Sequence, residues 1–141
     1  MKTALDTNIL SNLWSAQPME AAIRSALRKL EQGGPLVISP AVYAEALAHP
    51  TYSEDGVRNF LEVTGITIDF PLSNSAWTEA GRRYREYAIR RRQSQAEPPR
   101  RLLADFLVGA HALLQADQLL TLDVKFYRTN FPELALYPIG E

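Results

Sequence analysis

Several features that would point to other classes of protein are missing from this sequence. The 141-residue chain has no cysteine, which excludes disulfide bonds and cysteine-ligated zinc sites and fits a reducing compartment. No apolar run approaches the ~20 residues of a membrane-spanning helix. At the amino end, Asp6 and Asn8 interrupt any signal-peptide core. We therefore expect a cytoplasmic protein without a membrane segment.

A strong net charge is also missing, but the charge is unevenly distributed. The formal charge of the whole chain is −1, and eight of the twelve arginines lie between Arg82 and Arg101. A nearly neutral protein has no general attraction for nucleic acid, whereas a local band of arginines attracts phosphate groups. Any nucleic-acid contact is therefore expected in the carboxyl-terminal half.

The hydrophobic pattern predicts one α/β domain over residues 1–141. With 46% hydrophobic residues, a chain of this length buries a substantial core. Short apolar runs predict strands at 2–6, 36–38, 66–70 and 119–122, with a candidate edge strand at 134–137. Helical spacing predicts helices at about 8–15, 18–33, 40–49, 54–64, 74–93 and 101–116. This alternation predicts a three-layer α/β/α fold with a central, mainly parallel sheet.

Four acidic residues are expected at the carboxyl edge of that sheet. Asp6 ends the first strand, and Asp123 follows the last clear strand by one residue. Glu45 and Asp105 lie early in helices that we expect to begin near the same edge. Crowded carboxylates repel one another unless a cation neutralises them, and Mg²⁺ or Mn²⁺ takes oxygen ligands. Such ions are the usual clamp for phosphodiester hydrolysis, which needs neither histidine nor cysteine.

The segments that carry these acids resemble a known family. The stretches ALDTNIL, SPAVYAEAL, ADFLVGAHALLQAD and LLTLDVKFY occur in the order found in PIN-domain proteins. More narrowly, they resemble the VapC-type toxins of toxin–antitoxin pairs, over a span from Thr3 to about Leu136. The resemblance implies an endoribonuclease that uses Mg²⁺ or Mn²⁺ and leaves a 5′-phosphate and a 3′-hydroxyl. It also implies a homodimer and a cognate antitoxin as protein partner.

The resemblance also assigns site residues. The acids of the family correspond to Asp6, Glu45, Asp105 and Asp123. Its polar positions correspond to Asn8 and Thr121, with Thr7 beside them, and these are expected to orient carboxylates or metal-bound water. Many relatives have a basic residue before the last acid, where this chain has Leu122. Arg101 and Lys125 are candidate substitutes for the missing phosphate contact.

The arginine band has three interpretations. It is a solvated helix face paired with Glu79 and Glu86, a contact for RNA phosphates, or a docking surface for an acidic antitoxin segment. The arginines that lack nearby acids flank the loop before Asp105, which favours RNA for that part. The expected RNA-binding residues are Arg90, Arg91, Arg92, Arg100, Arg101 and Lys125.

Structural interpretations of the same residues remain open. Asp6 is a plausible helix cap, and His111 is more typical of a hydrogen-bonded core histidine than of a metal ligand. Leu13, Trp14 and Leu47 suit either the core or a dimer interface.

Two other functions also remain open. The first is an inactive PIN-like domain that binds RNA or serves as a scaffold. The second is a phosphatase with Asp6 as nucleophile, which would want a second acid where this chain has Asn8.

Overall fold

The computed structural model describes residues 1–15, 17–94 and 101–139. Its strands are β1 (Thr3–Leu5), β2 (Leu36–Ile38), β3 (Thr67–Ile68) and β4 (Gln118–Leu120). The helices of these residues are α1 (Thr7–Trp14), α2 (Glu20–Gly33), α3 (Pro40–Leu47), α4 (Glu54–Thr64), α5 (Asn74–Gln93), α6 (Leu103–Gln115) and α7 (Val124–Asn130). None of the described helices is both long and apolar enough to span a membrane.

The four strands form one parallel sheet in the order β3-β2-β1-β4. Ala4 of β1 pairs with Val37 on one side and with Leu119 on the other, so β1 lies inside the sheet. The connections from β1 to β2 and from β2 to β3 step in one direction, and the connection from β3 to β4 crosses back. The order in which strands are added therefore reverses between the neighbouring strands β1 and β4, and we call this place the reversal point. Parallel sheets bind ligands at such a point, beyond the carboxyl ends of the strands.

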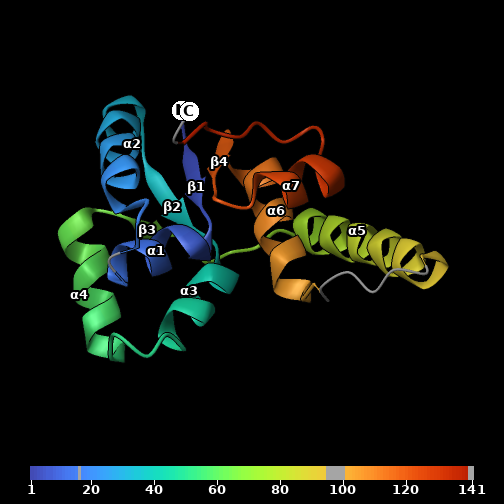
Figure 1. The fold of residues 1–141 in the computed structure, drawn as a ribbon, viewed down its shortest axis with the longest axis horizontal. Coiled ribbons are helices and arrows are strands. Elements are labelled where there is room, and N and C mark those ends of the chain that lie inside the picture. The colour runs from blue at the N-terminus through green and yellow to red at the C-terminus, as the bar shows by residue number, and fades with distance from the viewer. Residues whose placement is uncertain (16, 95–100, 140–141) are drawn as a thin grey trace.

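Helices cover both faces of the sheet, which confirms the predicted three-layer α/β/α fold. Because parallel crossovers are nearly always right-handed, the reversal puts α1–α4 on one face and α5–α6 on the other. Figure 1 shows α2 and α4 to one side of the strands and α5, α6 and α7 to the other. Helix α6 contacts α5 as well as β1 and β4, and it also meets α3. The amino ends of α3 and α6 are thereby tied to the central strands.

Local sequence signals set several helix boundaries as predicted. Ser39 accepts a hydrogen bond from the backbone N–H of Val42 at 3.2 Å, which caps α3. Ser53 caps α4 in the same way through the N–H of Gly56, at 3.1 Å. Gly65 ends α4 with a φ of 75°, a left-handed conformation that glycine adopts without steric cost.

Other predicted boundaries were wrong. The expected strand 134–137 is reduced to a single parallel bridge between Leu119 and Leu136. The bridge consists of two hydrogen bonds of 3.0 Å, from the N–H of Leu119 to the carbonyl of Ala135 and from the N–H of Tyr137 to the carbonyl of Leu119, and β4 itself ends at Leu120. The predicted strand 66–70 shortens to β3, just before Pro71. Helix α2 begins at Glu20, two residues later than predicted.

Helix α7 was not predicted. It has seven residues, which is too short for hydrophobic periodicity to reveal.

Burial settles three of the open structural interpretations. Leu13 and Trp14 are 8% and 9% exposed and belong to the core, whereas Leu47 is 37% exposed. Leu13 and Trp14 therefore pack within the chain, and the predicted homodimer stays a prediction. His111 is 1% exposed, and its Nε2 lies 2.9 Å from Oδ2 of Asp69. The prediction of a hydrogen-bonded core histidine is confirmed.

Candidate active site

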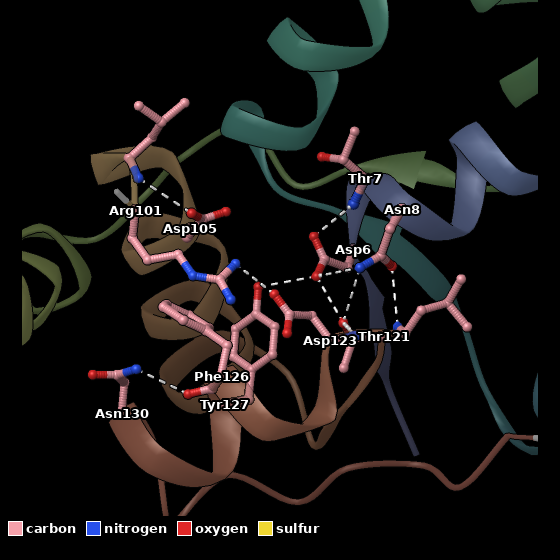
Figure 2. A network of polar contacts seen from close by, with 12 residues as sticks. Asp6, Thr7, Asn8, Arg101, Asp105, Thr121, Asp123, Phe126, Tyr127 and Asn130 are labelled. Carbon is pink, nitrogen blue, oxygen red and sulfur yellow. Dashed lines mark hydrogen bonds and ion pairs between the residues drawn. The ribbon is translucent and has the colours of Figure 1, made fainter. Parts of the chain in front are cut away.

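Asp6 is the centre of a hydrogen-bond network at the reversal point between β1 and β4 (Figure 2). Its Oδ1 accepts the backbone N–H of Thr7 at 2.7 Å, which caps α1. Its Oδ2 accepts hydrogen bonds from the hydroxyl groups of Thr121 at 2.7 Å and Tyr127 at 3.1 Å. The side-chain amide of Asn8 donates to the same oxygen at 3.3 Å. Asp6 is thus both a helix cap and the most connected acid of the site.

The residues beside Asp6 hold the loop after β4 against α1. The side-chain oxygen of Asn8 accepts the N–H of Leu122 at 3.1 Å, and Thr121 Oγ1 accepts the N–H of Asp123 at 3.0 Å. The position where many relatives have a basic residue is thus occupied by a leucine whose backbone fastens the loop. Thr121 thus contacts both Asp6 and the backbone of Asp123, and Asn8 contacts Asp6 and the loop that leads to Asp123.

Burial and the charges of neighbouring acids raise the pKa values of Asp6 and Asp105. Burial raises the pKa of Asp6 from 3.8 to about 6, although three hydrogen bonds to the carboxylate oppose the shift, and the charge of Asp105 adds to it. The pKa of Asp105 is also raised, mainly by burial and further by the charge of Asp123. Asp6, Asp105 and Asp123 therefore lie near enough to influence one another, and Figure 2 shows their carboxylates pointing toward a common space.

Glu45 reaches this site through a neighbour. It lies in the second turn of α3, and its Oε1 accepts a hydrogen bond from the hydroxyl of Thr7 at 2.6 Å. Since Thr7 directly follows Asp6, this bond ties α3 to the carboxyl end of β1. The side chain of Thr7 thus contacts one of the four predicted acids, Glu45.

One of the acids already has a cation beside it. Arg101 Nη1 lies 2.7 Å from Oδ2 of Asp123, and both side chains are about one-third exposed. The guanidinium carbon of Arg101 also lies 4.7 Å from the centre of the Phe126 ring, within cation–π range.

The donor chemistry of the site suits a hard divalent cation. Its acids supply only oxygen ligands, and they carry mutually repelling charges that a cation would compensate. The arrangement is not closed around an ion: within residues 1–15, 17–94 and 101–139, no group of three or more acids and histidines is placed to hold a metal together. Two of the four acids have other partners: Asp123 contacts Arg101, and Glu45 contacts Thr7.

A groove of about 390 Å³ adjoins the acids on the side of Asp123. Arg90 and Arg91 of α5 line it on one side, and Lys125 of α7 lines it on the other, with Arg101 between the groove and the acids. Arg90 donates to the side-chain oxygen of Asn130 at 2.5 Å, which joins α5 to α7.

One described residue among the expected RNA contacts lies outside the groove lining. Arg92 is exposed on α5 and is not part of the groove wall. Arg100 lies outside the described residues.

The arginine band divides into two halves with different surroundings. Arg83 forms ion pairs with Glu79 at 2.9 Å and with Glu133 at 2.5 Å, and Arg82 lies 3.6 Å from Glu79. Arg82, which is 68% exposed, therefore fits a solvated, acid-paired helix face, whereas Arg83 is only 12% exposed and joins α5 to Glu133. The second half faces the groove.

Tyr127 is a site residue that the sequence analysis missed. It is 1% exposed, it donates to Asp6, and its own pKa is raised well above 10 by burial and by the nearby acids. The sequence offered one signal for it. Tyr127 follows Asp123 by four residues, which in a helix places it about one turn beyond that acid, but no helix was predicted there.

The fold and the acids define the class of protein: an α/β/α domain with an acidic cluster at the reversal point of a parallel sheet. The profile of the family described as "PIN domain" matches residues 3–132. The chain therefore belongs to the PIN-domain family. No curated protein matches the chain at a significant level.

Solved structures from three bacteria share this fold. VapBC2 from Rickettsia felis, bound to a DNA fragment from its promoter, is 21% identical, with a TM-score of 0.73, and the match covers 99% of this chain and 100% of that one. VapBC-1 from nontypeable Haemophilus influenzae is 26% identical, with a TM-score of 0.62 and 97% of each chain covered. A toxin–antitoxin complex from Klebsiella pneumoniae is 20% identical, with a TM-score of 0.64 and 96% of each chain covered.

Proposed function

We propose that this protein is a metal-dependent endoribonuclease and the toxin of a VapC-type toxin–antitoxin pair. The observation that carries the proposal is the convergence of Asp6, Asp105 and Asp123, whose charges perturb one another beside a groove lined with cations. A protein that only binds RNA gains nothing from crowded, partly buried carboxylates, because each costs free energy to ionise. The inactive-scaffold alternative therefore has less physical support.

The proposal assigns Asp6, Asp105, Asp123 and Glu45 as the residues that hold Mg²⁺ or Mn²⁺. The bound ion supplies a Lewis acid that activates water and neutralises charge on the reacting phosphate. Thr121, Tyr127 and Asn8 keep the Asp6 carboxylate oriented, and they support its ionised form because all three donate to it. Thr7 orients Glu45 by donating its hydroxyl to Oε1.

RNA is proposed to enter along the groove between α5 and α7. Arg90, Arg91 and Lys125 line that groove and would bind backbone phosphates on the side of Asp123. The scissile phosphate would then lie at the acids, where Asp123 borders the groove with its positively charged side chains. Arg92 and Arg100 remain predicted RNA contacts.

The proposed protein partner rests on the assemblies in which similar folds have been solved. The three similar structures are of VapBC or toxin–antitoxin assemblies. We propose that this chain likewise binds a cognate antitoxin, and that it forms a homodimer.

The test is cleavage of end-labelled structured RNAs by wild type and Asp6→Asn, with Mg²⁺, with Mn²⁺ and with EDTA, followed by mapping of the product ends. The matched control is Asp55→Asn, which makes the same chemical change at a side chain that is 94% exposed on α4. We expect cation-dependent cleavage by wild type and by the control, with 5′-phosphate and 3′-hydroxyl ends, and no cleavage by Asp6→Asn. Cleavage that persists in EDTA or in Asp6→Asn would exclude this site as its source.

A separate trapping experiment addresses the phosphatase alternative. A phosphatase with Asp6 as nucleophile would form a phosphoenzyme, which acid quenching with a labelled phosphate monoester would trap. We expect no trapped label, because residue 8 is Asn and supplies no second acid for that chemistry.

A further inference from the structure

Arg101 is held in place by contacts at both ends of the residue. Its backbone N–H donates to the hydroxyl of Tyr87 at 2.9 Å, which fixes the start of the segment leading into α6. Its guanidinium lies over the ring of Phe126 and contacts Asp123 at 2.7 Å (Figure 2). The ring and the carboxylate together fix the position of the guanidinium, so Arg101 differs from a surface arginine that moves freely in solvent.

This placement puts a permanent positive charge inside the acidic cluster. Arginine stays protonated at every accessible pH, so its charge cannot be removed by titration. Its charge also acts on Asp105, whose pKa it lowers against the opposing effects of burial and of Asp123. One guanidinium thus compensates part of the repulsion between two acids.

A divalent cation that uses Asp123 would meet this guanidinium directly. Two cations close to one carboxylate repel each other, and Arg101 already contacts Oδ2 of Asp123, one of the two oxygens that could bind an ion. No other described cation forms an ion pair with Asp6, Glu45, Asp105 or Asp123. Arg101 is therefore the described cation whose charge opposes an ion at Asp123.

We propose that Arg101 is a built-in counter-ion of the acidic site, and that divalent metal binds in competition with it for Asp123. This inference rests on the proposed function, because it assumes that the acids are metal ligands. Before the ion binds, Arg101 keeps the carboxylates compatible with a folded site. When the ion binds, the guanidinium is released at the boundary of the groove proposed to hold RNA.

The proposal makes Arg101 an opponent of metal binding, which a purely structural arginine would not be. Replacing it with glutamine removes the charge and keeps a hydrogen-bonding side chain, while the backbone contact to Tyr87 remains. We expect Arg101→Gln to bind Mn²⁺ about tenfold more tightly than wild type, because the competitor is gone. Arg101→Lys keeps the charge without the planar fork and should fall between the two.

The measurement is Mn²⁺ affinity, from electron paramagnetic resonance of free Mn²⁺ during titration of the purified full chain. The control is Arg58→Gln on α4, whose arginine is 64% exposed and pairs with acids of its own helix, so its Mn²⁺ affinity should equal that of wild type. A second readout is the melting temperature with and without Mn²⁺. The Mn²⁺-induced rise should be larger in Arg101→Gln, since tighter ligand binding stabilises the folded state more.

The outcomes separate the two proposals. Mn²⁺ binding that is lost in Asp6→Asn supports the metal site, and tighter binding by Arg101→Gln then supports the counter-ion. If binding depends on Asp6 but Arg101→Gln binds equally or more weakly, the counter-ion proposal is refuted and the metal site stands. If neither wild type nor Arg101→Gln binds Mn²⁺, both proposals are refuted. A lower melting temperature of Arg101→Gln that Mn²⁺ does not offset would indicate a structural role only.

Discussion

Replacing Asp6 with asparagine should make the stability of the protein less dependent on pH. Asp6 is 7% exposed, and burial raises its pKa from 3.8 to about 6. A carboxyl whose pKa is raised in the folded state favours folding when it is neutral. That contribution is complete below the unfolded pKa and is lost as the pH rises through the folded pKa. Ionised Asp6 is therefore a destabilising group near neutral pH.

The size of the effect follows from the shift. A pKa raised from 3.8 to about 6 corresponds to about 3 kcal/mol. About 2.5 kcal/mol of this falls between pH 4 and pH 7.5 for these two pKa values. Asp6→Asn carries no charge at either pH, so its stability should not include this loss.

The assay is urea unfolding of both proteins in EDTA at intervals from pH 4 to pH 7.5. The quantity to compare is the difference in unfolding free energy between Asp6→Asn and wild type at each pH. Hydrogen bonds that asparagine cannot reproduce add a nearly constant offset, so the pH dependence isolates the charge. We expect the difference to rise by about 2.5 kcal/mol in favour of the mutant. A difference that stays constant with pH would refute the account of Asp6 as a buried acid with a raised pKa.

Two further predictions concern single contacts. Thr7→Val removes the hydroxyl that holds Glu45 at 2.6 Å, so RNA cleavage should fall about tenfold, whereas Thr7→Ser should cleave normally; full activity of the valine variant would contradict the orienting role. Gly109→Ala would push a Cβ into the ring of Phe131 and should lower the unfolding free energy by about 1–3 kcal/mol. Gly81→Ala has no atom within 4 Å of the new Cβ and should stabilise helix α5 by about 0.5–1 kcal/mol, so equal urea midpoints for the two alanine variants would contradict the packing.

The alternation of apolar runs and helical segments was enough to predict the layers of the fold. Parallel strands end on one edge whatever their order, so Asp6 and Asp123 could be placed at the same edge from their positions after β1 and β4. Capping residues such as Ser39 and the terminating Gly65 act on their immediate neighbours. Their effects are local, and a local pattern is what a sequence displays directly.

The organisation of the site itself was only partly predictable. Four acids and their supporting Asn8 and Thr121 followed from motif order, but the bond from Tyr127 to Asp6 did not. These two residues are 121 positions apart, and α7 is too short to be recognised by periodicity. The predicted strand 134–137 failed for a related reason, because its pairing also depends on residues far away in the sequence. A strand exists only where a partner accepts and donates its backbone hydrogen bonds, and here the pairing is a single bridge to Leu119.

Sequence by itself determined which groups are present: an acidic set of oxygen ligands, no cysteine, and a band of arginines in the second half of the chain. Tertiary structure alone decided how those charges pair. It assigned Arg83 to Glu133 and Arg101 to Asp123, and it left Arg90 and Arg91 on a groove. The reason is that charge–charge energy depends on distance and burial, and neither quantity exists until α5, α6 and α7 have packed together.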